Sequence, residues 1–207
     1  MYQELILIII VFCVVYFMFI YDPRTEYMAS DGKKYKIFKT DNEEINKKKA
    51  DMLMEINNVA HKIVNYMYEN QLPTKKIADT TKNRFQNTTI VEILEVEGAA
   101  HTIGKTRMTI CLLTKGKFND MNDCIFVILH ELAHVMSDSY GHGEEFKQNF
   151  NFIIKLAVKL GLWKDAKYEN KNKNYCGVNI TTSPCSYEQC KMKSLDHYYK
   201  ESLLDYK

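Results

Sequence analysis

Two histidines and a glutamate stand in the spacing that many zinc hydrolases use. Residues 130–134 read HELAH, which matches the pattern H-E-x-x-H at His130, Glu131 and His134. Histidines four residues apart project from the same face of a helix, so both imidazoles can reach one tetrahedral ion. The glutamate then points toward the open coordination position, where it can activate water as a general base. The spacing predicts a zinc metalloendopeptidase with one catalytic Zn²⁺ ion.

The residues around this motif are uncharged, as expected for a helix buried beneath an active site. They are Ile128, Leu129, Leu132, Ala133, Val135 and Met136. Burying a polar group without a partner costs about 1–3 kcal/mol, and a bound metal would remove that cost. The alternative is a core helix whose histidines bond to backbone carbonyls.

A third metal ligand must come from residues after the motif. His142 is the simplest candidate because imidazole suits zinc. We expect Gly141 to end the motif helix in a left-handed conformation, which lets the chain fold His142 back toward the metal. Glu144, Glu145 and Asp138 remain alternatives.

With these residues the chain resembles the compact zincin metallopeptidases of the WLM and SprT-like families. The likeness rests on HELAH, a short loop and GHGEEF at 141–146, and it covers roughly residues 88–163. The steps at 175–177 (YCG) and 183–185 (SPC) also resemble uncharacterised zincin-like proteins of large DNA viruses. The resemblance implies a peptidase whose single zinc ion is held by the three histidines, with the motif glutamate as general base.

Candidate substrate contacts lie just before the motif. Residues 89–94 and 107–112 alternate as strands do, with a turn or an irregular edge between them. In zincins a strand before the catalytic helix typically lines the cleft, and an extended peptide pairs with its edge. We therefore expect substrate contacts at His101, Thr102 and Lys105, with an ordinary hairpin loop as the alternative.

The periodicity of the remaining chain predicts an α+β fold. It consists of a small zincin-like domain with a long helix, a short antiparallel or mixed sheet, the H-E-x-x-H helix and a following helix. We expect Asn119 or Asp120 to cap the motif helix. The expected helices are residues 43–69, 75–85, 120–138 and 144–160.

The first twenty residues contain an unbroken apolar run from Leu5 to Ile20. As a helix this run would be roughly 24 Å long, workable for a bilayer core of about 30 Å. The chain starts without lysine or arginine, which favours an uncleaved anchor over a signal peptide. We predict an N-terminal transmembrane helix and a single-pass protein of a viral or host membrane. Arg24 and Lys33 follow the run, which predicts a cytosolic catalytic domain.

Length and charge limit the remaining choices. The chain of 207 residues has room for one domain with appendages, and its net charge of +2 gives no indication of nucleic-acid binding. The expected partners are a protein or peptide substrate and the lipid bilayer, and the oligomeric state stays open. The expected segments are an anchor (1–21), a polar linker (22–42), the peptidase domain (43–163) and a cysteine-containing tail (164–207).

Six cysteines form no obvious framework. Cys111 and Cys124 lie in apolar runs and are predicted to be buried thiols. The tail cysteines lack the paired spacing of a zinc ribbon. They could form a second metal site with His197, form a disulfide in an oxidising compartment, or supply Cys176 as a blocking ligand of the catalytic zinc. The tail cysteines are Cys176, Cys185 and Cys190.

A different class of function would keep the metal without turnover. The chain would then be a membrane-anchored, zinc-bearing binding or scaffold protein. Glu131 argues against this, because a structural site has no use for a base beside an open position. Hydrolysis of a non-peptide amide is a further alternative, which cleft depth would distinguish.

Overall fold

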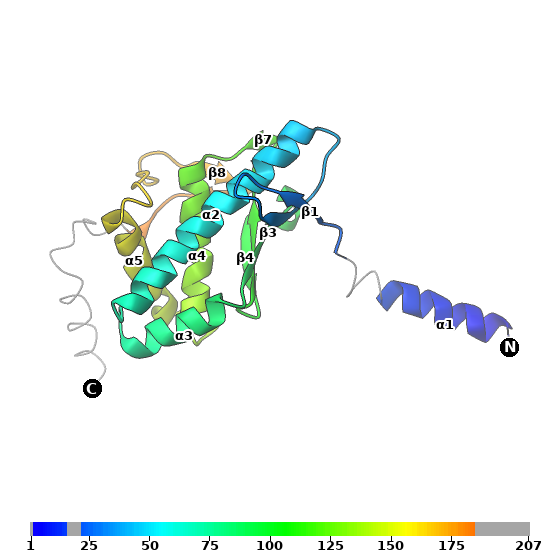
Figure 1. The fold of residues 1–207 in the computed structure, drawn as a ribbon, viewed down its shortest axis with the longest axis horizontal. Coiled ribbons are helices and arrows are strands. Elements are labelled where there is room, and N and C mark those ends of the chain that lie inside the picture. Colours follow the sequence, from blue (N-terminus) through cyan, green and yellow to red (C-terminus); the bar gives the residue numbers. More distant parts are fainter. Residues whose placement is uncertain (1, 16–21, 185–207) are drawn as a thin grey trace.

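The described part of the chain is a mixed α+β fold, seen in a computed structural model that describes residues 2–15 and 22–184 (Figure 1). The helices are α1 (Tyr2–Val15), α2 (Glu43–Glu69), α3 (Lys75–Phe85), α4 (Met121–Met136) and α5 (Glu144–Lys159), with a 3-10 turn η2 (Glu95–Glu97). The strands are β1 (Thr25–Met28), β2 (Lys34–Ile37), β3 (Thr89–Ile93), β4 (Ala100–Ile103), β5 (Arg107–Cys111), β6 (Leu113–Thr114), β7 (Lys117–Phe118), β8 (Lys173–Tyr175) and β9 (Val178–Ile180).

The helices begin at side-chain caps that the sequence makes recognisable. The side chain of Asn42 accepts bonds from the backbone at the start of α2, Thr74 does the same for α3, and Asp120 for α4. Both α2 and α3 have the predicted bounds. The apolar stripe of α2 is fully buried and packs toward α4 and the sheet; it consists of Leu53, Ile56, Ala60, Ile63 and Met67.

A three-stranded sheet in the order β3-β5-β4 supports α4. The central strand β5 runs parallel to β3 and antiparallel to β4, and it is buried from Met108 to Cys111. The turn between β4 and β5 has positive φ angles at Gly104 and Lys105, as a type I′ turn requires. The segment expected to be a turn or an irregular edge is therefore partly a regular strand, β4, which lies against α4 (Figure 1).

The prediction of an N-terminal transmembrane helix is wrong. Among the described residues, no helix combines the length and the apolar character that crossing a membrane requires. The described helix α1 begins at Tyr2, before the apolar run starts, and has 14 residues. At about 1.5 Å per residue it is roughly 21 Å long, against a bilayer core of about 30 Å. Residues 16–20 of the run lie outside the described part.

Two hairpins lie where no regular structure was expected. The β1–β2 hairpin occupies the segment predicted to be a polar linker, and β8–β9 lies in the predicted cysteine-containing tail, for which no strand was expected. The turn of the second hairpin consists of Cys176 and Gly177, both with positive φ, at 46° and 80°. Such a two-residue turn matches the twist of the flanking strands.

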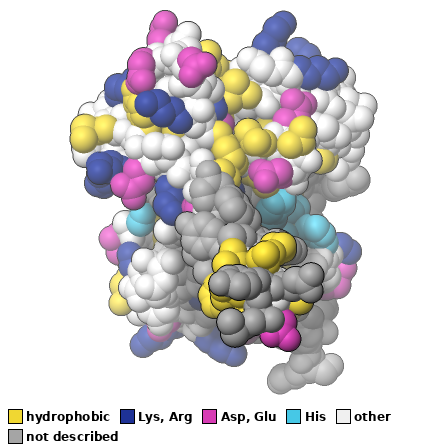
Figure 2. Space-filling view, turned by 90° about the vertical axis from the view of Figure 1, so that its right-hand side faces the viewer, with side chains coloured by type: hydrophobic (Ala, Val, Ile, Leu, Met, Phe, Trp, Pro, Cys, Tyr) yellow, Lys and Arg dark blue, Asp and Glu magenta, His cyan; other side chains and the backbone are white. Residues whose placement is uncertain are grey.

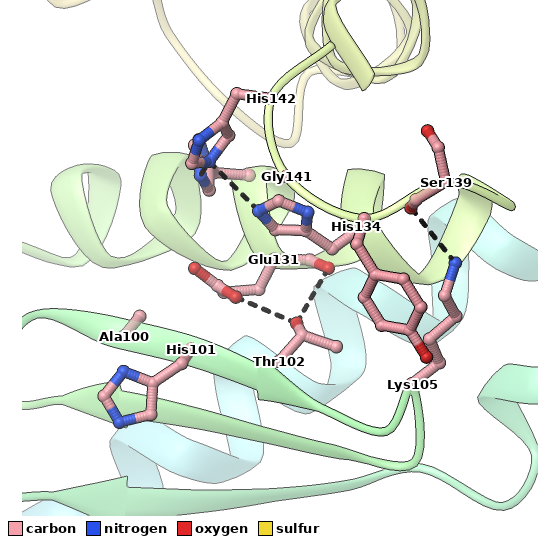
Figure 3. Close-up of a pocket in the computed structure, with 11 residues that line it drawn as sticks. Ala100, His101, Thr102, Lys105, Glu131, His134, Ser139, Gly141 and His142 are labelled. Carbon is pink, nitrogen blue, oxygen red and sulfur yellow. Dashed lines mark hydrogen bonds between the residues drawn. The ribbon is translucent and has the colours of Figure 1, made fainter. Parts of the chain in front are cut away.

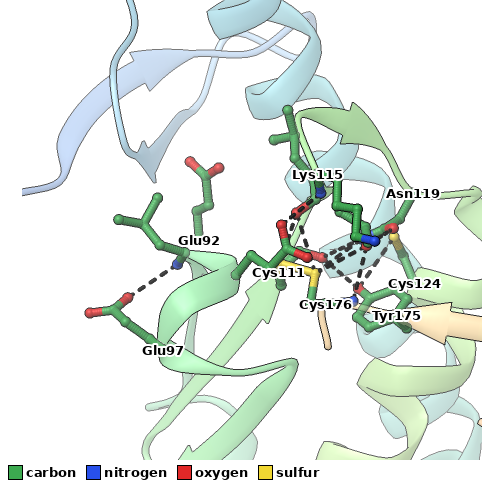
Figure 4. The surroundings of a disulfide bond; sticks show 12 residues. Glu92, Glu97, Cys111, Lys115, Asn119, Cys124, Tyr175 and Cys176 are labelled. Atoms are coloured by element: carbon green, nitrogen blue, oxygen red, sulfur yellow. Dashed lines mark hydrogen bonds between the residues drawn. A yellow bond between two sulfur atoms is a disulfide. The ribbon is translucent and has the colours of Figure 1, made fainter. Parts of the chain in front are cut away.

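The predicted buried thiol at Cys111 is instead half of a disulfide with Cys176 (Figure 4). The Sγ of Cys176 is therefore not a ligand that could block a catalytic zinc. Cys124 is buried and outside any disulfide, as predicted. The other members of the hypothetical second metal site, Cys185, Cys190 and His197, lie outside the described residues.

Candidate metal centre

Helix α4 carries the first two histidines of the site. Its residues Ile128, Leu129, Leu132 and Ala133 are fully buried, so the helix is held along its length by the core. The helix ends at Met136, and the hydroxyl of Ser137 donates a hydrogen bond to the carbonyl of Ala133. The helix end thus precedes Gly141, which was expected to terminate it and lies further along the loop with φ +80°.

The loop after α4 is shaped by Glu145, at the start of α5. Its carboxylate accepts hydrogen bonds from the backbone N–H of Asp138 and Ser139 at 2.6 and 2.9 Å. Asp138 also pairs with Arg84 at 2.6 Å, and Glu144 pairs with Lys147 at 2.5 Å. The three carboxylates considered as alternative ligands are therefore engaged elsewhere.

The same loop brings His142 back to the two helix histidines (Figure 3). The Nε2 atom of His142 lies 3.0 Å from Nε2 of His130 and 3.2 Å from Nε2 of His134. All three ligand atoms lie within 4.8 Å of one another. Imidazole nitrogens bound to one tetrahedral zinc at about 2.0–2.1 Å would be about 3.3 Å apart. The donor set and its spacing fit a zinc ion.

The protonation of the histidines suits this role. Burial lowers the pKa of His130 to about 3, with contributions from His134 and His142. Burial also lowers the pKa of His134 to about 4, assisted by His142 and Lys105. Both rings are thus neutral near pH 7, which is the form that binds a metal.

Glu131 lies beside the three histidines and is only 4% exposed. Its carboxylate accepts a hydrogen bond of 2.8 Å from the hydroxyl of Thr102 on β4. Burial raises the pKa of Glu131 to about 7, and the Thr102 bond works in the opposite direction. A carboxylate with such a pKa is suited to accepting and returning a proton near neutrality.

Phe146 of α5 packs against all three histidine rings. Its ring centroid lies 4.3 Å from that of His134, 4.6 Å from His142 and 4.8 Å from His130. Because Phe146 is itself buried, it restricts the orientation of the three rings. Positioning rings in this way lowers the cost of assembling a metal site.

The residues expected to contact substrate all line a pocket of about 270 Å³ at the histidines. Their side chains differ in direction. Thr102 points toward Glu131, whereas the ring of His101 points away from the three histidines (Figure 3). Lys105 donates hydrogen bonds to the carbonyls of Ser137 and Asp138. Lys105 therefore holds the loop that carries His142, a positional role that the sequence did not indicate.

Other residues of the site carried no local sequence signal. Arg84 of α3 donates to the carbonyls of Val135 and Ser137, both at 3.0 Å, and so secures the end of α4. Arg84 is more than fifty residues from these partners in the sequence, so no local sequence pattern predicts the contact. Phe146 and Glu145 belong to GHGEEF, but their roles depend on how the loop folds back.

Three curated viral proteins resemble this chain. Uncharacterized protein R325 of Acanthamoeba polyphaga mimivirus is 33% identical over 110 residues, which are 51% of this chain and 56% of that protein. Uncharacterized protein 136R of Invertebrate iridescent virus 6 is 37% identical over 92 residues (42% and 51%), and Uncharacterized protein 042R of Invertebrate iridescent virus 3 is 33% identical over 98 residues (46% and 58%). The chain thus spans little more than half the length of these relatives. No protein-family model matches the chain, and no solved structure gives a significant match.

Proposed function

We propose that this protein is a zinc-dependent metallopeptidase that hydrolyses peptide bonds. The observation that carries the proposal is the meeting of three imidazole Nε2 atoms within 4.8 Å beside a buried carboxylate. A zinc ion held by His130, His134 and His142 would supply Lewis-acid activation of a water molecule and of the scissile carbonyl.

In this mechanism Glu131 is the general base. It accepts a proton from the attacking water and passes that proton to the departing amine. The hydrogen bond from Thr102 holds the carboxylate in place and favours its ionised form. The apolar surroundings of α4 limit access of bulk water to the carboxylate.

The edge strand β4 offers a place for an extended peptide. The carbonyl of Ala99 accepts a hydrogen bond from the backbone N–H of Cys111, and the backbone N–H of His101 donates to Thr109 Oγ1. The backbone polar groups of Ala99 and His101 therefore face β5. Alternate residues of an antiparallel strand face opposite ways. The backbone groups of Ala100 and Thr102 therefore face the outer edge, where a peptide can add as a further strand.

Zinc analysis and cleavage mapping of the full chain test the proposal. We expect about one zinc ion per chain, and cleavage of a proteome-derived peptide library that stops when zinc is chelated. Glu131→Gln should retain zinc and lose cleavage by at least about 10²-fold, because general base catalysis typically contributes about 10²–10⁴-fold.

The variant His134→Ala provides the matched control for the metal. It should lose both zinc and activity, while circular dichroism reports a folded protein. Wild-type activity in zinc-loaded Glu131→Gln would show that the wrong base has been named. A wild-type protein that binds zinc but cleaves no peptide would favour a metal-bearing binding protein.

A further inference from the structure

A second, apolar pocket adjoins the metal site. It has a volume of about 310 Å³ and shares Ala100, His130, Glu131 and His142 with the first pocket. Phe126 and Val127 of α4 form its inner side. Pockets that hold a ligand are mostly apolar, with few polar groups, and this volume lies at the lower end of their usual range of about 300–1,000 Å³.

The outer wall of this pocket is the β8–β9 hairpin, through Tyr175, Val178 and Ile180. Val178 and Ile180 share one face of β9 because strand residues alternate, and Val178 is 51% exposed. Figure 2 shows hydrophobic and histidine side chains exposed on one face of the molecule. A half-exposed apolar wall next to a polar site indicates a surface that receives an apolar group.

Long-range bonds hold the hairpin in this position (Figure 4). Cys176 in its turn is disulfide-bonded to Cys111 at the end of β5, and the Cys176 N–H donates to Thr114 Oγ1 at 3.0 Å. The buried Tyr175 hydroxyl donates to the carbonyl of Cys111 at 2.6 Å. The wall of the pocket is therefore tied to the same sheet that carries β4.

The position of the pocket along β4 relates it to the scissile bond. The pocket opens at Ala99 and Ala100, whereas Thr102 and Lys105 line the first pocket. A peptide that pairs antiparallel with β4 runs from the Lys105 end toward Ala100. Its residues after the scissile bond then reach the apolar pocket.

We propose that this apolar pocket is a substrate subsite, walled by the β8–β9 hairpin, that takes a large aliphatic or aromatic side chain on the carboxyl side of the scissile bond. The inference rests on the proposed peptidase function, because a position after the scissile bond is defined only if the protein cleaves peptides. The presence of a subsite for an apolar side chain is a separate property, which binding measures without turnover.

Val178→Trp tests the subsite because it fills the pocket from a half-exposed position. Asn179→Trp is the matched control, because Asn179 is exposed on the opposite face of the same strand. The first measurement titrates N-acetyl-leucine amide and N-acetyl-glycine amide into the full chain, with methyl NMR signals of Val178 and Ile180 as the readout. The leucine compound should shift these signals in wild type and Asn179→Trp, and the glycine compound should not.

The second measurement is cleavage of host peptides with leucine, phenylalanine, glycine or aspartate after the scissile bond. Wild type and Asn179→Trp should prefer leucine and phenylalanine about tenfold or more, in line with the discrimination an apolar pocket provides. Val178→Trp should lose that preference and still cut before glycine.

The outcomes separate the two proposals. If peptides are cleaved but Val178→Trp does not change the preference for the residue after the scissile bond, the subsite proposal fails and the peptidase proposal stands. If no peptide is cleaved, the peptidase proposal fails and the methyl titration decides the subsite. If the leucine compound shifts no methyl signal in wild type, or shifts the Ile180 methyl signals equally in wild type and Val178→Trp, the subsite proposal fails.

Discussion

Thr102 shows how one hydroxyl can tune the proposed general base. Its bond to Glu131 stabilises the ionised carboxylate, whereas burial favours the protonated form and raises the pKa to about 7. Because Glu131 must be ionised to accept a proton, the balance between these two effects sets the pH above which the proposed base can act. The side chain of Thr102 is thus a positioning group for Glu131.

We predict that Thr102→Val raises the pKa of Glu131 by about one unit, because hydrogen bonds to charged groups contribute about 1.5–3 kcal/mol. The acidic limb of the kcat/KM profile should move to higher pH, and activity at pH 7 should fall about fivefold, because the ionised fraction of Glu131 falls by that factor. Thr102→Ser, which keeps the hydroxyl, should retain the wild-type profile. Superimposable profiles for Thr102→Val and wild type would contradict this role.

The motif residues of the site could be read from the sequence, and the residues that support them could not. His130, Glu131 and His134 are related by helix geometry, so four-residue spacing suffices to bring them together. His142 depends on a loop that Glu145 and Lys105 shape through backbone contacts. Those contacts are made to backbone N–H and C=O groups, which every residue has, so residue types do not reveal them. For this reason the sequence alone could not exclude the carboxylates as alternative ligands.

Helices and strands that depend on local sequence features were predicted, and those that depend on long-range contacts were not. Helices α2 and α3 have their predicted bounds because caps and apolar periodicity are local properties. The three-residue strands β8 and β9 are too short to show an alternating pattern. The Tyr175 hydroxyl donates a hydrogen bond to the carbonyl of Cys111, which is 64 residues away in the sequence. The disulfide could not be assigned for the same reason, since its cysteines are 65 residues apart.

The disulfide should contribute strongly to stability. Closing a loop of 65 residues removes conformational freedom from the unfolded chain worth about 4 kcal/mol in the chain-entropy treatment. We predict that reductant lowers the free energy of unfolding of wild type by roughly that amount in urea titrations. Cys176→Ser should be destabilised similarly and should not respond to reductant. An equal response of both proteins to reductant would exclude this cause.

Across the described fold, a buried ion pair links helix α2 and strand β3 with the residue that follows β2. Lys49 of α2 lies 2.9 Å from Glu92 of β3, and both side chains are almost fully buried. Lys49 also donates to the carbonyl of Phe38, and Glu92 accepts from the Phe38 N–H, just after β2. The pair thus ties the N-terminal hairpin to the core. Burial raises the pKa of Glu92, and Lys49 opposes that rise.

We predict that Lys49→Met destabilises the protein by about 3–5 kcal/mol, because it leaves a buried carboxylate without its cation. Without Lys49 the pKa of Glu92 rises further above its unfolded value. The folded state then binds the proton more tightly, so stability should recover as the pH falls toward the unfolded pKa. Thermal unfolding between pH 8 and pH 5 measures this recovery.

Adding Glu92→Gln to Lys49→Met removes the charge and keeps an acceptor for Phe38. The double variant should regain part of the lost stability at pH 8 and lose the pH-dependent recovery. An unfolding midpoint of Lys49→Met that equals the wild-type midpoint at every pH would refute the structural importance of the pair.

The cystine that links Cys111 to Cys176 spans the loop that bears His142. Tyr140 in that loop is 85% exposed, so it is an accessible position for nicking by the protein itself or by another protease. A chain nicked there would stay covalently in one piece, and denaturing electrophoresis would show two fragments only after the sample is reduced. Tests for autolysis should therefore compare reduced and unreduced lanes, because the unreduced lane alone would hide the cut.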